Sequence, residues 1–228
     1  GTGQFVADMD TSGHLFAYVV RSEHAHARIA SVDVDEALAL DGVVAVHTES
    51  DLARDNVGCL MCPSELPGVV LPPRRALVRD VARHVGDPIA LVIAKTAAIA
   101  LEAAELVVVD YDALPAAIGS VAALCEVAPQ VWPQAPGNLV FSFEKGDGEG
   151  VAAAMASARH VVELEFDNTR VSAAPMEPRA GFGAFDPVTE RYTLTCTAQG
   201  VHGIRDQLAK DIFGVPAEQV RVVAPDVG

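Results

Sequence analysis

The stretch from Thr197 to Gly203 is the first candidate for chemistry, because a predicted strand ends there in the amide of Gln199 and the backbone turns into a helix. Free N–H groups at the start of a helix can hold an anion or an oxo ligand. A helix cap without any ligand explains the same residues equally well. The two interpretations therefore stay open on the residues alone.

A second stretch, Ala174 to Arg179, holds Glu177 and Arg179 beside prolines that stiffen the backbone, immediately before a predicted buried strand. Opposite charges this close together fit an internal salt bridge. Local structure does not fully explain either stretch.

Two pairs of potential metal ligands are present. Cys59 and Cys62 have the spacing of half a zinc site or a redox pair, but no second pair with matching spacing exists, which favours ordinary loop thiols. His24 and His26 would face one side of an extended segment, where a metal could bridge them, yet the sequence offers no clear third ligand. We therefore predict structural histidines and no metal site, with a small metalloprotein built on these four residues as the weaker alternative.

Composition and motifs exclude several classes of function. The glycine-rich stretch Gly146 to Gly150 carries two acids that would repel phosphate and lacks the required lysine, so it predicts a turn. No nucleophile elbow or hydrolase triad is visible. The net charge of -15, with 31 acidic and 16 basic residues, argues against nucleic acid and anionic membranes as partners. Without a membrane span or signal peptide pattern, we expect a cytoplasmic protein with reduced thiols.

The first half of the chain alternates short strand-like and helix-like segments, which favours an α/β arrangement over an all-β sandwich. The strands on either side of Gly86 to Pro88 are predicted to form a hairpin, and Thr96 to cap an alanine-rich helix. The expected strands are Leu15 to Arg21, Ile29 to Val34, Val43 to His47, Ala76 to Val85, Ile89 to Ala94 and Val107 to Tyr111, with helices at Asp35 to Leu40 and Ala97 to Leu106.

A stretch rich in Pro, Gly, Asn and Ala, from Ala116 to Gly148, predicts a long surface connection to a second α/β layer. In that layer Asp186 to Thr189 suits a hairpin turn and Gly214 a helix stop. We expect helices at Val151 to Ala158 and Gly203 to Phe213, and strands at His160 to Asp167, Ala180 to Phe185, Tyr192 to Thr197 and Gln219 to Val223.

Several segments together resemble the large, molybdenum-cofactor-binding subunit of the xanthine dehydrogenase, aldehyde oxidase and aerobic carbon monoxide dehydrogenase family. Those that resemble its a/b hammerhead domain are Arg21 to Ile29, Asp41 to Val46 and Val85 to Ala90. Those that resemble the start of its molybdopterin-binding domain are Pro175 to Arg179, Gln199 to His202 and Val222 to Gly228. The resemblance implies an α/β (α+β) fold with a hammerhead domain at 1–117, a linker at 118–145 and a truncated molybdopterin-binding domain at 146–228.

The resemblance also implies site residues. The family's matching glutamine approaches the molybdenum centre and hydrogen-bonds an oxo ligand, which implies this role for Gln199, with Gly200 and Gly228 beside the cofactor. Gly228 matches the first glycine of a loop that lies against the cofactor in the family. The family's catalytic base is a glutamate far toward the C-terminus of the subunit, and neither Glu163 nor Glu177 matches it.

The implied cofactor is molybdenum-molybdopterin, completed by residues outside this chain, with iron-sulfur clusters and often FAD on partner chains or domains. The chain opens at Gly1 without an initiator Met and ends at Gly228 after a predicted strand, so we expect a missing continuation and no turnover by the isolated chain. The rival hypothesis is a non-catalytic scaffold or assembly module paired with a separate catalytic chain. The substrate is left unassigned.

Overall fold

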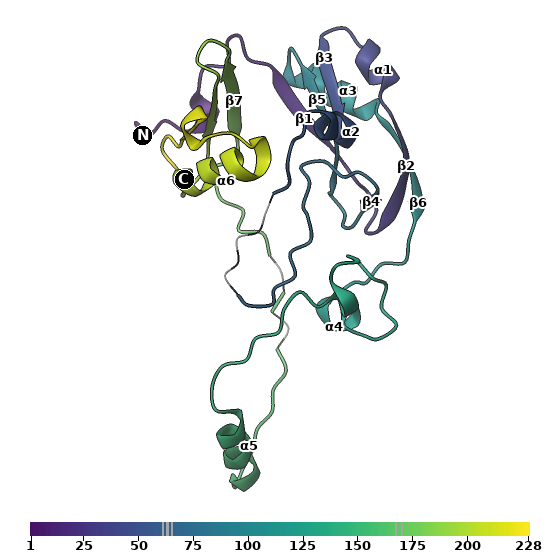
Figure 1. Ribbon diagram of the computed structural model, residues 1–228, viewed down its shortest axis with the longest axis vertical. Helices are drawn as coiled ribbons and strands as arrows, with labels where there is room; N and C mark the ends of the chain where they lie inside the picture. The colour runs from purple at the N-terminus through teal and green to yellow at the C-terminus, as the bar shows by residue number, and fades with distance from the viewer. Residues whose placement is uncertain (61, 63, 65, 167, 170) are drawn as a thin grey trace.

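The computed structural model describes residues 1–60, 62, 64, 66–166, 168–169 and 171–228. Two compact bodies lie side by side, and a long arm that ends in α5 (Gly148–Ser157) extends away from both (Figure 1). Both chain termini lie beside the second body. No helix among the described residues has the length and apolar character of a membrane span.

The first body contains a three-stranded antiparallel sheet in the order β1 (Phe16–Arg21), β5 (Pro88–Ala94), β3 (Val43–Thr48). Helices α1 (Asp35–Ala39) and α3 (Ala97–Glu105) pack on it. Alanines on the buried face of α3 let that helix approach the sheet closely. The buried core residues at this contact are Ala37, Val46, Ala90, Val92, Ala103 and Ala104.

A second antiparallel sheet of the first body has the order β4 (Val81–Ala82), β2 (Ala27–Asp33), β6 (Val108–Ala113). These bounds confirm the predicted β2 and β6 strands to within about two residues. Helix α2 (Glu49–Arg54) was not predicted; it is a short helix that directly follows β3 and begins with a capping box between Thr48 and Asp51.

The predicted hairpin of Ala76 to Val85 with Ile89 to Ala94 is wrong. Both edges of β5 are occupied, by β1 and by β3, so no edge remains for a third partner. Only Val81 and Ala82 form a strand, and they pair with β2. The predicted turn before β5 is nevertheless present, and it is built around Gly86, whose φ is +91°.

Arg83 joins the connection between the bodies to the first body. Arg83 stacks over the ring of Trp132 at 3.8 Å from its centroid, and its Nε donates to the Val131 carbonyl at 3.0 Å. Two short elements lie in this connection, α4 (Ser120–Ala123) and η2 (Pro136–Asn138). The connection therefore lies partly against the first body.

The arm departs from the prediction in two ways. Helix α5 begins at Gly148 rather than Val151, because Asp147 caps it by accepting a hydrogen bond from the Gly150 amide at 2.8 Å. The predicted strand at His160 to Asp167 is absent over residues 160–166, while Asp167 lies outside the described residues. An alternating sequence becomes a strand only where another strand pairs with it, and among the described residues none does.

The second body is the sheet β7 (Gly181–Asp186), β8 (Arg191–Cys196), β9 (Val220–Val223). Strands β7 and β8 form the predicted antiparallel hairpin, whereas β8 and β9 run parallel. The connection from β8 to β9 is α6 (Val201–Gln207), the π-helix η3 (Leu208–Phe213) and η4 (Ala217–Gln219). The predicted helix stop is confirmed, because Gly214 follows η3 in the left-handed conformation with a φ of +63°.

Contacts between the two bodies include one at Gly58 and one at the N-terminal part of the chain. The Gly58 amide, in the loop after α2, donates to the Ile212 carbonyl of η3 at 2.8 Å. Residues 1–15, which we name the N-terminal strap and which include η1 (Val6–Asp8), run from the second body to β1. The His14 ring of the strap packs edge-on against Phe182 of β7 with 4.9 Å between centroids.

Candidate functional site

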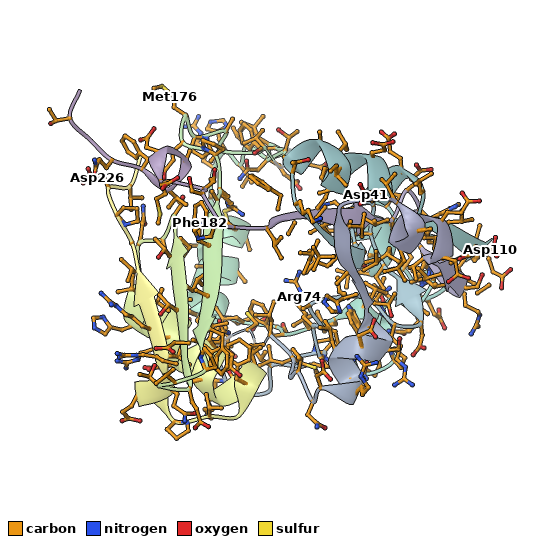
Figure 2. The ribbon with its side chains drawn as sticks, turned by 90° about the horizontal axis from the view of Figure 1, so that it is seen from above. Asp41, Arg74, Asp110, Met176, Phe182 and Asp226 are labelled. Carbon is orange, nitrogen blue, oxygen red and sulfur yellow. The ribbon has the colours of Figure 1, made fainter. Side chains whose placement is uncertain are left out.

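Three chain segments leave the second sheet at the same end, which we name the open edge (residues 174–180, 197–200 and 224–228). Because β8 and β9 are parallel, with Thr195 opposite Val223, their carboxyl ends lie together. Strand β7 is antiparallel to β8, with Gly181 opposite Cys196, so its start lies there too. Figure 2 shows Met176 and Asp226 beyond this end of the sheet. Ligands commonly bind outside the carboxyl ends of parallel strands.

Glu177 lies at the centre of the open edge and is 8% exposed. Its Oε1 accepts a hydrogen bond from the Thr197 hydroxyl at 3.0 Å, and its Oε2 accepts one from the Gly228 amide at 2.6 Å. A Cβ on Gly228 would lie 3.0 Å from the Cβ of Glu177. The backbone therefore approaches Glu177 closely because residue 228 is a glycine.

The N-terminal strap holds the same segment from its other side. The Gln4 amide donates to Asp226 Oδ2 at 2.8 Å, and the Asp226 amide donates to the Gln4 carbonyl at 3.1 Å. Residues 226–228 are thus fixed between the strap and Glu177.

Gln199 and Gly200 occupy the turn between β8 and α6, and both are exposed. Among the described residues no partner hydrogen-bonds the Gln199 side chain, and a Cβ placed on Gly200 would meet no atom within 4 Å. The structure therefore brings Gln199, Gly200 and Gly228 to one edge and leaves an unpaired amide facing open space.

Two other polar side chains near this edge, Arg179 and Cys196, show no feature that indicates a catalytic role. Arg179 is exposed and, within the described ranges, forms no ion pair with Glu177, so the expected salt bridge is absent. Burial raises the pKa of the Cys196 thiol at the end of β8, which disfavours a thiolate there. Sequence reasoning did not give Glu177 a role at this edge. The signals for one were a carboxylate between two prolines before a strand and the place of this segment among those that resemble the molybdopterin-binding domain.

His24 and His26, the histidines considered as metal ligands, have protein partners. His26 Nδ1 lies 2.7 Å from the Pro115 carbonyl, and the His24 ring packs against Tyr111 with 4.7 Å between centroids. The thiols of Cys59 and Cys62 are free. Within the part of the chain that the structure describes, no three His, Cys, Asp or Glu side chains gather closely enough to hold a metal ion.

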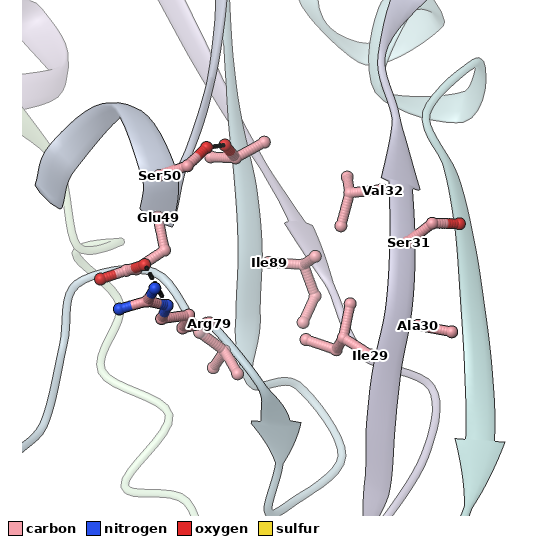
Figure 3. A pocket seen from close by; sticks show the side chains of 10 residues that line it. Ile29, Ala30, Ser31, Val32, Glu49, Ser50, Arg79 and Ile89 are labelled. Carbon is pink, nitrogen blue, oxygen red and sulfur yellow. Dashed lines mark hydrogen bonds and ion pairs between the residues drawn. The ribbon is translucent and has the colours of Figure 1, made fainter. Parts of the chain in front are cut away.

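A separate open hollow of about 250 Å³ lies in the first body between α2 and β2 (Figure 3). Glu49 at its wall is 3% exposed and forms ion pairs with Arg75 at 2.8 Å and Arg79 at 3.6 Å. Both arginines are partly exposed, so the carboxylate is buried while its counter-charges reach solvent. This arrangement ties the segment before β4 to the start of α2.

Comparisons with known proteins agree with the two-body division. A family model described as "Aldehyde oxidase and xanthine dehydrogenase, a/b hammerhead domain" matches residues 1–115. A second, described as "Molybdopterin cofactor-binding domain", matches residues 131–228. The open edge lies wholly within the second match.

Individual relatives are longer than this chain. The carbon monoxide dehydrogenase large chain of Afipia carboxidovorans is 34% identical over 240 residues, which cover 100% of this chain and 29% of that protein. Quinoline 2-oxidoreductase from Pseudomonas putida 86 superposes with a TM-score of 0.89 at 33% identity, covering 99% of this chain and 28% of the other. Reconstituted CO dehydrogenase from Oligotropha carboxidovorans gives 0.88 at 34% identity, with 99% and 29% coverage.

The fold of each body, the position of the open edge and these matches lead to one assignment. The chain belongs to the aldehyde oxidase and xanthine dehydrogenase family, and it carries that family's a/b hammerhead domain and part of its molybdopterin cofactor-binding domain.

Proposed function

We propose that this chain is part of the molybdenum-binding subunit of a molybdenum hydroxylase and that the open edge holds the molybdopterin cofactor. The observation that carries the proposal is the unpaired Gln199 amide at an edge that lies inside the match to a molybdopterin cofactor-binding domain. Bound there, the cofactor would supply the redox chemistry for oxygen transfer to an electron-poor carbon.

The residues at the edge suit such a group. An amide side chain donates and accepts hydrogen bonds, so Gln199 can bind an oxo ligand through its NH₂ group. Gly200 leaves its backbone N–H group uncovered by a side chain, as a group with many oxygen atoms requires, and the glycine at 228 lets the backbone pass close to Glu177. The carboxylate of Glu177 is already engaged by two donors and presents little charge to a ligand.

The rest of the large subunit is the first partner that we propose, since the chain spans 29% of the carbon monoxide dehydrogenase large chain. The arm supports this proposal because it exposes a run of apolar side chains that a monomer seldom leaves in water. Those more than 60% exposed include Phe143, Val162, Leu164, Phe166 and Val171. An iron-sulfur subunit and a flavin subunit in a cytoplasmic complex complete the proposal, by analogy with the family.

Substitution of Gln199 tests the site. In the complete enzyme, Gln199→Ala should slow turnover about a hundredfold to a thousandfold, because a hydrogen-bond donor to the reacting centre is lost. Molybdenum and pterin content should stay at the wild-type level. The measurements are steady-state rates with the enzyme's substrate, metal analysis and fluorescence of the released pterin.

Gln219→Ala is the matched control, because Gln219 precedes β9 and lies at the opposite end of the sheet. It should leave turnover unchanged. Equal rates for wild type and Gln199→Ala would remove Gln199 from the active site. A wild-type complex free of molybdenum and pterin would instead favour the non-catalytic scaffold.

A further inference from the structure

The carboxylate of Glu177 joins two segments of the open edge that are far apart in the sequence. Its partners, Thr197 and Gly228, lie 20 and 51 residues away. We propose that Glu177 is a positioning residue, which fixes the Gly228 backbone relative to the Gln199 turn so that both meet the cofactor in one arrangement. The cofactor part of this inference rests on the function proposed above.

The energetics of burial make this contact specific. A carboxylate that is 8% exposed is costly unless hydrogen bonds or opposite charges compensate for the lost water. Across the described ranges no cation pairs with Glu177, so the compensation comes from the Thr197 hydroxyl and the Gly228 amide, one for each oxygen. Hydrogen bonds to an ionised acceptor are short and strong. Movement of either segment would leave one oxygen buried and unpaired.

The position of the two donors connects the contact with the site. Thr197 is two residues before Gln199 on the same turn, and Gly228 ends the segment that the N-terminal strap already holds through Asp226. The strap joins that segment to residues that precede β1, whereas Glu177 joins it to the end of β8. The contact through Glu177 thus links Gly228 directly to the turn that carries Gln199.

The test uses the full-length subunit in its complex, and it compares wild type with Glu177→Ala and Glu177→Gln. Hydrogen-deuterium exchange read by mass spectrometry follows the fragment that contains the Gly228 amide. Because the broken hydrogen bond has a charged acceptor, exchange in Glu177→Ala should be at least about tenfold faster. Bound pterin should fall at the same time. Glu177→Gln, which keeps one acceptor oxygen, should lie between the two.

Thr197 offers a matched pair of variants. Thr197→Val keeps the shape and removes the donor to Glu177, whereas Thr197→Ser keeps the hydroxyl. Thr197→Val should speed exchange around the Gln199 turn and lower pterin content, and Thr197→Ser should restore both. Glu218→Gln, at an exposed acid of η4, should change neither.

The outcomes separate the inference from the function on which it rests. Wild-type exchange at Gly228 in Glu177→Ala overturns the contact. Faster exchange with full pterin content overturns its role toward the cofactor, leaving a structural contact only. A wild-type complex without pterin overturns the proposed function instead, and the exchange experiment still decides whether Glu177 holds Gly228.

Discussion

Glu49 and Glu177 are both buried, and different kinds of partner compensate their carboxylates. Glu49 pairs with the guanidinium groups of Arg75 and Arg79, while Glu177 is satisfied by neutral donors. The first arrangement serves the fold of the hammerhead domain, and the second lies at the candidate cofactor site. The role of a buried acid therefore has to be inferred from the groups that compensate its charge, because burial alone does not distinguish Glu49 from Glu177.

Substitution of Glu49 should lower the stability of the protein, because this buried acid serves the fold. Glu49→Gln should lower the free energy of unfolding by about 1–3 kcal/mol, because two arginines lose their counter-charge and a buried amide takes its place. Thermal unfolding of the purified protein measures the change. Glu102→Gln, on the exposed side of α3, should stay within about 0.5 kcal/mol of wild type. A Glu49→Gln protein as stable as the control would show that the ion pairs contribute nothing.

Elements bounded by local signals were predictable from the sequence. Thr96 caps α3 by accepting a hydrogen bond from the Ile99 amide, Gly214 ends η3, and Asp186 builds the β7–β8 turn through the Val188 amide and the Thr189 hydroxyl. Each of these contacts spans six residues or fewer, so the residue types reveal it.

Pairing between distant strands was not predictable in the same way. The strand expected at Ala76 to Val85 fails because β5 is already paired on both edges, and the strand expected at residues 160–166 has no partner among the described residues. The candidate site shows the same difference between local signals and contacts of distant residues. The Gln199 strand end was visible in the sequence, but nothing local could indicate that Glu177 reaches Gly228.

The turn of the β7–β8 hairpin contains a residue with a strained backbone conformation, and a glycine there would relieve the strain. Glu190 has a φ of +53°, a conformation that costs a residue with a Cβ about 1 kcal/mol. Glu190→Gly should therefore raise stability by about 0.5–1 kcal/mol in thermal unfolding. Val188→Gly, at an exposed position of the same turn with ordinary φ, should lower stability by a similar amount. Loss of stability in both variants would mean that the Glu190 conformation carries no strain.

At the scale of the molecule, the two bodies depend on a close backbone contact at Gly58. A Cβ there would lie 1.8 Å from the Asp211 carbonyl oxygen, too near for any side chain. The contact joins the loop after α2 to the π-helix that supports the β7–β8–β9 sheet.

Gly58→Ala should force the two bodies apart and cost about 1–3 kcal/mol, as overpacking does in a filled core. Limited proteolysis and thermal unfolding should both register the change, with new cleavage near η3. Gly203→Ala is the control, since a Cβ at Gly203 meets no atom within 4 Å and alanine favours the helix. An unaltered cleavage pattern in Gly58→Ala would show that the bodies do not rely on this contact.

The N-terminal strap has a consequence for how the protein is made. Gln4 leaves the ribosome before Asp226, its hydrogen-bond partner, which lies 222 residues later. At about 5–20 residues per second, translation separates the two by roughly 10–45 s. During that time the hammerhead domain can fold, but the strap cannot yet bind Asp226. The contact between the strap and Asp226 is therefore a late event in the folding of this chain.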